Sequence, residues 1–413
     1  MGHQHPKRRL GAWSVIALLA VFSLVAAACG DDDDATTTPA ATEAEPAAPA
    51  AEEPEAEEPA MEEPAEGAPA EAAAEALADG EPCVRAAFLV VRDVHDSGWN
   101  EAHGNGANYL AEQMPCAEVT VLTDVIDDQT SEGVMRDLAE DGYDLIFGTS
   151  FGYLEFMSRV APEYPDVVFE HATGYLTDAN FSNYSGSLYE ATYLAGLVAG
   201  SLTETNKLGY VGPFTTPDVL RDFNAWVVGA REVNPDVEVQ MIWVNTWFDP
   251  AQETQAAQTL LDNGADVLFY GTSGGAVGQA ADAAGALWVA GNGLARGFAP
   301  ESFLTGPSYE WGVYYVEAAQ AVRDGTWDNI PYWGSMADGF INLADFGPAV
   351  PGDIAEMVNA RRAEIEAGNF DVFVGPIVDH EGNLQVPDGE PASLDHIWGV
   401  DYVLDGIEGT LPN

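Results

Sequence analysis

From Pro82 onward, short runs of apolar residues alternate with longer segments that carry apolar residues at helical spacing. Each run is about four to eight residues long, the usual length of a strand that is buried on both faces. Strands that alternate with helices in this way form βα units and a parallel sheet. The pattern therefore predicts an α/β fold in which helices flank parallel sheets.

The chain contains two successive series of such units. In the first, we expect strands at 86–91, 119–122, 145–148 and 167–170 and helices at 100–113, 130–141 and 153–164. The pattern restarts at Asn206, with expected strands at 208–211, 237–244, 267–270 and 287–290 and helices at 219–233, 250–263 and 275–284. Because the chain from Pro82 onward is longer than one hydrophobic core usually serves, we expect two lobes.

The residues after about 303 hold too few elements for a third domain. We expect helices at 309–323 and 351–367 and strands at 339–343 and 372–374. These elements are better assigned to the two existing lobes, so the chain must cross between the lobes more than once. We assign residues 82–205 and about 305–330 to the N-terminal lobe, and 206–304 and about 331–413 to the C-terminal lobe.

The first 81 residues follow a different pattern. Three basic residues precede an apolar run that ends in small residues before Cys29, which is the layout of a bacterial secretory signal over residues 1–29. We interpret Cys29 as an acylated lipoprotein anchor; the alternative is an ordinary signal cleaved before a structural cysteine. Residues 30–81 repeat Ala, Glu and Pro and lack Lys, Arg and aromatic residues, so we expect a disordered linker.

The charge balance narrows the choice of partners. The chain has 14 Lys and Arg against 68 Asp and Glu, a formal net charge of −54. This acidity argues against a nucleic-acid partner and against attachment to anionic lipids through a basic patch. Membrane attachment would then depend on the acyl chains at Cys29, and the acidity is also weakly indicative of a saline habitat.

The other two cysteines, Cys83 and Cys116, each lie just before an expected strand. If those strands are parallel neighbours, both cysteines lie at the same edge of the sheet, and an exported compartment permits a disulfide. We prefer a disulfide to the alternative of two free thiols. No metal site is expected, because the histidines lack ligand spacing: His95, His103, His171, His380 and His396.

Motifs for enzyme chemistry are missing from the sequence. There is no phosphate-binding loop, no His-Glu-x-x-His helix and no Gly-x-Ser-x-Gly nucleophile elbow. The glycine-rich segment 291–297 misses the dinucleotide-binding spacing by one residue. We therefore expect a binding protein without a cofactor, not an enzyme.

Two strand-end segments, 94–100 and 244–250, resemble each other. Each carries a tryptophan, Trp99 or Trp247, together with Asn and Asp just before a helix. In open parallel sheets ligands bind beyond the carboxyl ends of the strands, so both indoles are candidates for a cleft between the lobes. The alternative is that both rings belong to the core, as large aromatic side chains usually do.

Polar residues near the strand ends are the candidates for contacts to a ligand's edge. They are Asp96, Asn100, Ser150, Glu170 and Asn245, with Phe151 as a further aromatic candidate. Four of these five polar candidates have a structural alternative. Asn245 suits a turn, and Asp96, Asn100 and Ser150 suit helix caps.

The stretches HDSGWN, GTSFGY, FEHATGY, NKLGYVG and VNTWFDP, with DGTW, YWG and VFVGPI later, resemble the basic membrane protein family of ABC-transporter solute-binding lipoproteins. The resemblance extends over residues 85–406 and is strongest to the purine-binding branch. It implies a periplasmic-binding-protein-like (type I) fold with two lobes and several crossovers. It also implies that Trp99 and Trp247 hold a flat base between them.

What the resemblance implies about function is a monomer that binds a purine base, adenine first, and delivers it to an ABC permease and ATPase. A purine nucleoside is the alternative ligand, and a ligand-sensing receptor subunit that transports nothing is the alternative role. Family members carry an acidic residue in a Gly-x-Asp motif where this chain has Asn292. We keep Asn292 as a site candidate and favour the free base, because an amide lacks the charge expected to hold ribose hydroxyls.

Overall fold

The computed structural model describes residues 81–412 and contains two parallel sheets. The first sheet has six strands in the order β11-β5-β4-β3-β1-β2, and every neighbouring pair is parallel. Its strands are β1 (Val84–Leu89), β2 (Ala117–Leu122), β3 (Leu145–Gly148), β4 (Val168–Ala172), β5 (Phe181–Gly186) and β11 (Tyr332–Gly334). Parallel strands covered by helices confirm the predicted fold class.

Helices cover both faces of this sheet because its strands are apolar on both sides. In β1, Ala86 and Phe88 pack into one core cluster with residues of α2 (Trp99–Gln113) and α9 (Trp311–Asp324). Their neighbours Ala87 and Leu89 pack into another, with residues of α3 (Ser131–Glu140) and α4 (Leu154–Val160). The two-residue alternation of a strand thus divides β1 between two helical layers.

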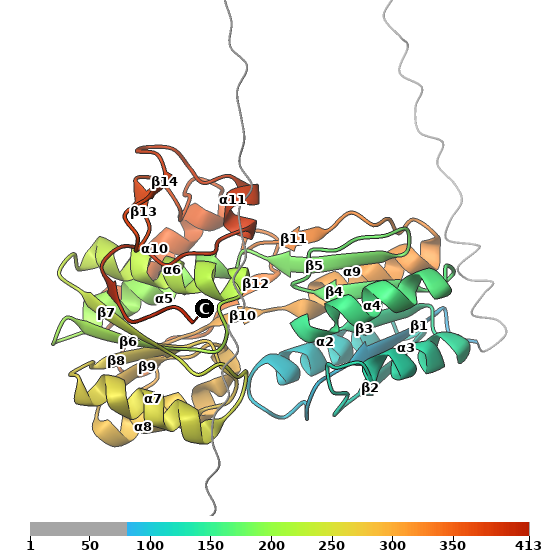
Figure 1. The fold of residues 1–413 in the computed structure, drawn as a ribbon, viewed down its shortest axis with the longest axis horizontal. Helices are drawn as coiled ribbons and strands as arrows, with labels where there is room; N and C mark the ends of the chain where they lie inside the picture. Colours follow the sequence, from blue (N-terminus) through green and yellow to red (C-terminus); the bar gives the residue numbers. More distant parts are fainter. Residues whose placement is uncertain (1–80, 413) are drawn as a thin grey trace, which may run out of the picture. The chain divides into compact units, whose positions relative to one another are not determined.

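The second sheet has five parallel strands in the order β15-β7-β6-β8-β9. Its strands are β6 (Lys207–Gly212), β7 (Glu238–Trp243), β8 (Val267–Tyr270), β9 (Leu287–Val289) and β15 (Ile407–Glu408). Its helices are α5 (Leu188–Leu202), α6 (Pro217–Val233), α7 (Pro250–Asp262) and α8 (Ala276–Ala284). Figure 1 shows α7 and α8 on one face of this sheet and α5 and α6 on the other.

The chain returns to each sheet late in the sequence. After β9, two short antiparallel strand pairs form: β10 (Pro307–Tyr309) with β12 (Ile341–Leu343), and β13 (Ile377–Val378) with β14 (Leu384–Val386). The helices of this region, apart from α9, are α10 (Gly352–Glu366) and the short α11 (Leu394–Trp398). Between them, α9 packs on α2 of the first sheet, and β11 joins β5.

The placement of β11 corrects one expected boundary. We assigned residues from about 331 to the C-terminal lobe, but Tyr332–Gly334 pair with Tyr184–Gly186 of the first sheet. The short strand satisfies backbone groups along the edge of β5 that would otherwise lack partners. Helix α5, within the range assigned to the N-terminal lobe, likewise packs chiefly on α6 and α10.

β5 and α5 are the two longest elements that were not predicted, and one expected strand is wrong. All six residues of β5 are buried although its sequence FSNYSG is polar, and α5 has ten buried residues among fifteen. A helix that is apolar around most of its circumference lacks the one-sided pattern that reveals helices. The expected strand at 372–374 is wrong, because in this segment only Val374 pairs, through an isolated bridge to Pro391.

The strands β1 and β2 are neighbours, and the cysteines that precede them meet. Cys83 and Cys116 form a disulfide, with Cα atoms 5.4 Å apart. The Cys83 amide also donates to the Cys116 carbonyl at 2.9 Å. The disulfide therefore joins the starts of two paired strands at the edge of the first sheet.

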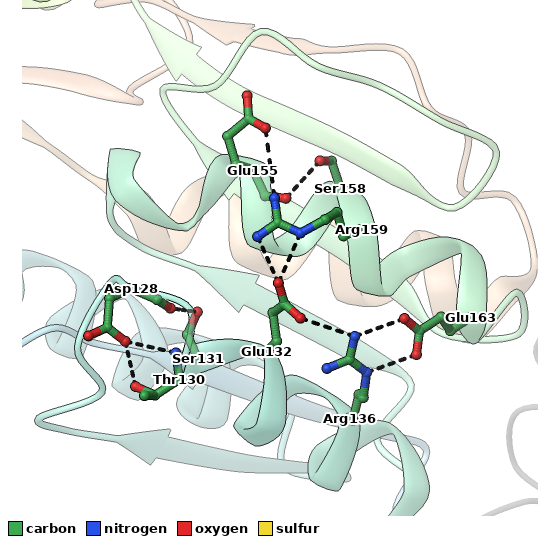
Figure 2. Close-up of polar contacts among 9 residues, drawn as sticks. All are labelled: Asp128, Thr130, Ser131, Glu132, Arg136, Glu155, Ser158, Arg159 and Glu163. Carbon is green, nitrogen blue, oxygen red and sulfur yellow. Dashed lines mark hydrogen bonds and ion pairs between the residues drawn. The ribbon is translucent and has the colours of Figure 1, made fainter.

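Several of the few basic side chains hold the surface of α3 and α4 together (Figure 2). Glu132 on α3 accepts from Arg136 at 3.2 Å and from Arg159 on α4 at 2.7 Å. Arg136 also donates to Glu163 at 2.8 Å. These partly exposed pairs contribute little individually, but together they link two helices on one face of the sheet.

Some predictions fall on residues outside those described. These are the signal over 1–29, the lipidation site Cys29 and the linker up to residue 80. Between residues 81 and 412, none of the helices has the length and apolar character needed to span a bilayer.

Candidate functional site

A cavity of about 180 Å³ lies between residues of the two sheets and their helices, all within one compact unit. Its lining comes mainly from segments that follow β1, β2, β3, β7, β8 and β9, which is where open parallel sheets bind ligands. The aromatic lining residues are Trp99, Phe151, Tyr210, Trp247, Phe248, Phe269, Tyr270 and Tyr309. The cavity therefore offers mostly flat apolar faces.

Trp99 is held firmly in this cavity. It is the first residue of α2, and its indole N–H donates to the carbonyl of Thr149 after β3. Its ring meets Trp311 at a centroid distance of 5.3 Å and Tyr309 at 6.0 Å, both nearly edge-on. The hydrogen bond and the ring contacts fix the orientation of this indole before any ligand arrives.

Trp247 lines the same cavity from the second sheet, but from a loop. Its carbonyl accepts from the Ser273 amide at 2.9 Å, and its ring packs against Phe214 at 5.1 Å. The helix that follows starts at Pro250, and Asp249 before it accepts from the amides of Ala251 and Gln252 at 3.1 Å each. Asp249 is thus the helix cap that its position before Pro250 predicts.

Four other sequence candidates line the cavity: Asn100, Ser150, Phe151 and Asn292. The Asn100 amide nitrogen donates to Asp96 at 2.7 Å, and its Oδ1 is buried without a partner. The Ser150 hydroxyl donates to Asp127 at 2.7 Å. The Asn292 oxygen accepts from the Leu294 amide at 3.0 Å, where it caps the 3-10 helix at Gly293–Phe298.

The remaining three candidates do not line this cavity. Asp96 uses its carboxylate for the start of α2, accepting from the amides of Gly98 and Glu101 at 3.0 Å each. Asn245 is exposed and has a φ of 54°, a left-handed conformation that Asn tolerates in turns. In both cases the local backbone explains the correction: Asp96 hydrogen-bonds the start of a helix, and Asn245 adopts a turn conformation, although both residues lie near strand ends.

Glu170 is the third correction. Its side chain is fully buried inside the first sheet and accepts from the indole N–H of Trp327 at 2.8 Å. Burial raises the pKa of Glu170 to about 7, against the lowering effect of hydrogen bonds from Trp327 and Tyr314. A carboxyl that is engaged in the core in this way is a structural group of the first lobe.

Sequence reasoning missed the charged residues of the cavity. Asp127 follows β2, Asp218 and Asp222 lie in the first two turns of α6, and Arg92 follows β1. The guanidinium of Arg92 lies 4.5 Å from the ring centre of Phe248. The helix that follows β6 was a findable signal, since its first turns point to the same carboxyl edge as the strand ends.

Three residues that line the cavity have a buried oxygen atom without a hydrogen-bond partner among the described residues: Asn100 Oδ1, Asp222 Oδ1 and Thr272 Oγ1. A buried polar atom without a partner is costly, so a ligand that hydrogen-bonds to these atoms would stabilise them. The lining carries three aspartate side chains and a single guanidinium, and this excess of acceptor groups also favours ligands with donor groups. No metal-binding cluster of His, Cys, Asp or Glu occurs within residues 81–412.

The family model described as "ABC transporter substrate-binding protein PnrA-like" matches residues 83–361. The chain belongs to this family. The match confirms the basic membrane protein family that the motifs indicated, whose members are solute-binding proteins and not enzymes. Its members work outside the cytoplasm with a permease and an ATPase, so the chain is the substrate-binding component of an ABC transporter.

Three relatives differ in the ligand that their names give. A purine-binding protein of Brucella abortus is 35% identical over 336 residues, covering 81% of this chain and 96% of that protein. A putative ABC transporter glucose-binding protein of Haloferax volcanii is 35% identical over 337 residues, with 81% and 83% covered. A nucleoside-binding protein of Lactococcus lactis is 28% identical over 145 residues, covering 35% and 41%.

Solved structures agree with the fold. A solute-binding protein of an ABC transporter system from Conexibacter woesei has a TM-score of 0.59 and 26% identity, covering 70% of this chain and 97% of that one. A second, from Aeropyrum pernix, has a TM-score of 0.60 and 20% identity, covering 71% and 94%. Both are likenesses to solute-binding proteins, as the periplasmic-binding-protein-like prediction requires.

Proposed function

We propose that the protein binds a purine base, adenine first, in the cavity between Trp99 and Trp247 and delivers it to its permease. The observation that carries this proposal is that both indoles line one aromatic cavity, which also contains unpaired acceptor atoms. Contacts from both sheets to one ligand would stabilise the closed arrangement of the lobes. A purine nucleoside is the alternative ligand within the same class.

The lining chemistry matches a flat molecule with N–H donors at its edge. Aromatic side chains gain contact energy from stacking on a planar ring and lose little conformational freedom on binding. Asn100 Oδ1, which is buried and unpaired, can accept from a ring N–H or an amino group. Adenine has both kinds of donor.

The charges of the cavity oppose a phosphorylated ligand. A nucleotide would bring its phosphate toward the carboxylates of Asp127 and Asp218, with only Arg92 among the lining residues to pair with it. Asn292, in place of the family's acidic residue, offers no charge to ribose hydroxyls. Both features favour the free base over its nucleoside and nucleotide.

A hexose is the second candidate, because the Haloferax volcanii relative is named as a putative glucose-binding protein at the same 35% identity. Sugars also pack on indole faces, and their hydroxyl groups donate to carboxylates and amides. A purine is planar and a hexose is not. The distance between the rings of Trp99 and Trp247 in the bound protein would therefore distinguish the two ligand classes.

Delivery is proposed to occur at the membrane surface. Cys29 would carry the acyl anchor, and residues 30–81 would act as a tether that leaves the monomeric binding unit free to collect ligand. Confinement near the permease raises the effective concentration of the protein there. Replacement of Cys29 by Ser should release the protein from the membrane fraction, and retention of that variant would contradict the anchor.

Calorimetric titration of the purified protein tests the ligand. Adenine, guanosine, AMP and glucose are titrated separately, and we expect adenine to bind most tightly and AMP not to bind. Binding of glucose without binding of adenine or guanosine would replace the purine proposal by the hexose one. Conversion of a bound nucleoside to base and ribose during the titration would instead show an enzyme.

A further inference from the structure

Asp222 is the most unusual charged residue of the cavity. It lies in the second turn of α6, lines the cavity, and its side chain is 14% exposed. Its Oδ1 is buried and has no hydrogen-bond partner among residues 81–412. An acceptor held in this state at a binding cavity is a group whose partner should come from the ligand.

The neighbouring arginine does not supply that partner. Arg221 Nε lies 4.0 Å from Asp222 Oδ1, which is too far for a hydrogen bond. The guanidinium, only 3% exposed, is directed to the first sheet instead, where it reaches the Ser185 hydroxyl at 3.4 Å. It also lies 5.0 Å from the ring centre of Trp333. Arg221 therefore links the two sheets, and although it stays within ion-pair distance of Asp222, it leaves Asp222 Oδ1 without a hydrogen bond.

Asp222 lies in the aromatic part of the cavity. Tyr210 and Tyr309 line the cavity together with Asp222, and burial, and next the nearby charge of Asp222, raises the pKa of each phenol. The Tyr309 ring in turn meets the ring of Trp99 at 6.0 Å. A flat ligand stacked on Trp99 would therefore lie in the same cavity as the Asp222 carboxyl.

The charged groups that face Asp222 determine its protonation. Burial raises the pKa of Asp222 to about 8; Arg221 opposes this shift and the like charge of Asp218 on the same helix supports it. Tyr210 on β6 and Tyr309 on β10 are uncharged at neutral pH. Near pH 7 the carboxyl is therefore neutral and carries one O–H donor and one carbonyl acceptor.

We propose that Asp222 is a specificity residue that recognises one edge of an adenine-type base. Its O–H donates to a ring nitrogen and its carbonyl oxygen accepts from the adjacent amino group. This pairing rests on the proposed function. It uses the same donor and acceptor pattern with which an Asn or Gln amide binds adenine in a bidentate way.

The test measures how the amino group of the ligand and the side chain at position 222 each change the affinity. Adenine and unsubstituted purine, which lacks the amino group, are titrated against the wild type, Asp222→Asn, Asp222→Leu and the control Asp236→Asn. Asp236 is exposed beyond the end of α6, so its substitution makes the same chemical change away from the cavity. Adenine is also titrated against the wild type and Asp222→Asn between pH 7 and pH 9, where adenine itself stays uncharged. A melting temperature is measured for every variant.

We expect a distinct result for the wild type and for each variant. Asp222→Asn keeps adenine affinity within about threefold and makes it independent of pH, because the amide keeps both hydrogen bonds and does not titrate. Wild-type affinity for adenine falls toward about tenfold per pH unit above pH 8, as the carboxylate loses its donor. Asp222→Leu loses on the order of 10- to 100-fold for adenine and much less for purine. The Asp236→Asn control matches the wild type.

Other results would overturn the role of Asp222. They are a wild-type affinity for adenine that is the same at pH 7 and pH 9, or an Asp222→Asn variant that retains the wild-type pH dependence. If Asp222→Leu does not fold, the isosteric Asp222→Asn still decides. A wild type that binds no purine would contradict the proposed function itself, whereas one that binds adenine without any effect of Asp222 contradicts only this inference.

Discussion

The two indoles of the cavity come from similar sequence segments but differ in how they are held. Trp99 starts a helix, donates a hydrogen bond and contacts the rings of Trp311 and Tyr309. Trp247 lies on a loop and has one ring contact, with Phe214, among the described aromatic pairs. The same motif thus forms a fixed wall of the cavity in the first lobe and a more loosely packed wall in the second.

The surroundings of the two indoles explain the difference. Behind Trp99, the buried His103 accepts or donates at the Tyr315 hydroxyl, which lies 3.1 Å from that of Tyr184. These groups join the first sheet to α2 and α9, so movement of Trp99 would disturb a whole layer. Trp247, on the loop between β7 and α7, packs against the edge of the core, and Phe214 is its partner among the described aromatic pairs.

The largest expected effect is that of Trp99→Ala. If this substitution destabilised the protein as little as a substitution on the surface does, the two indoles would not differ in how firmly they are held. We expect it to lower the free energy of unfolding by about 3 to 4 kcal/mol, because it removes a large packed aromatic side chain. It should also abolish measurable adenine binding. Urea unfolding measures the first effect and calorimetry the second. Trp99→Phe is the control, and it should recover part of both quantities.

A smaller effect is expected from Glu170→Gln, which tests whether the first lobe contains a carboxyl that prefers to stay neutral. The pKa of Glu170 is about 7 in the folded chain against an ordinary 4.5, so the folded state holds this proton more tightly. Stability should therefore decrease as pH rises from about 4.5 to 7, by on the order of 3 kcal/mol from this group.

Glu170→Gln removes that contribution while its carbonyl oxygen can still accept from Trp327. Urea unfolding at pH 5 and pH 8 should then show a smaller loss of stability in the variant. Glu190, whose pKa burial also raises to about 7, leaves a remaining slope in the same direction. Equal slopes for variant and wild type would show that Glu170 is already ionised in the folded protein.

The smallest effect on stability is expected from Trp247→Ala. Because this indole lies on a loop, we expect the free energy of unfolding to change by less than about 1 kcal/mol. Adenine affinity should still fall about tenfold or more through loss of one stacking face. Unfolding and titration are measured on the same preparation. A destabilisation as large as that of Trp99→Ala would remove the distinction between the two indoles.

The regular elements were largely predictable because strands buried on both faces are continuous apolar runs. The strands at 145–148 and 267–270 match β3 and β8 residue for residue. Elements that depend on distant partners were not predictable. β5 is polar yet fully buried, and β11 is a three-residue strand that exists only because β5 has a free edge. The α5 helix lacks a polar face because it packs on both α6 and α10.

The site shows the same division. Trp99, Trp247, Asn100, Ser150, Phe151 and Asn292 could be selected from their places near strand ends, and all of them line the cavity. Asp96 and Asn245 have the same kind of position, but local hydrogen bonding and backbone conformation use them otherwise. Nothing in the spacing of residues separates a helix cap from a ligand contact, since both require a short polar side chain before a helix.

By itself, the sequence determined the α/β class, the family and the two indoles, because periodicity and local motifs depend only on neighbours in the chain. Only the tertiary structure decided which of the polar candidates face the cavity and that Asp222 joins them. The state of that carboxyl depends on burial and on Arg221 being directed toward the first sheet. Those are properties of space around a residue, and a list of neighbours in sequence does not contain them.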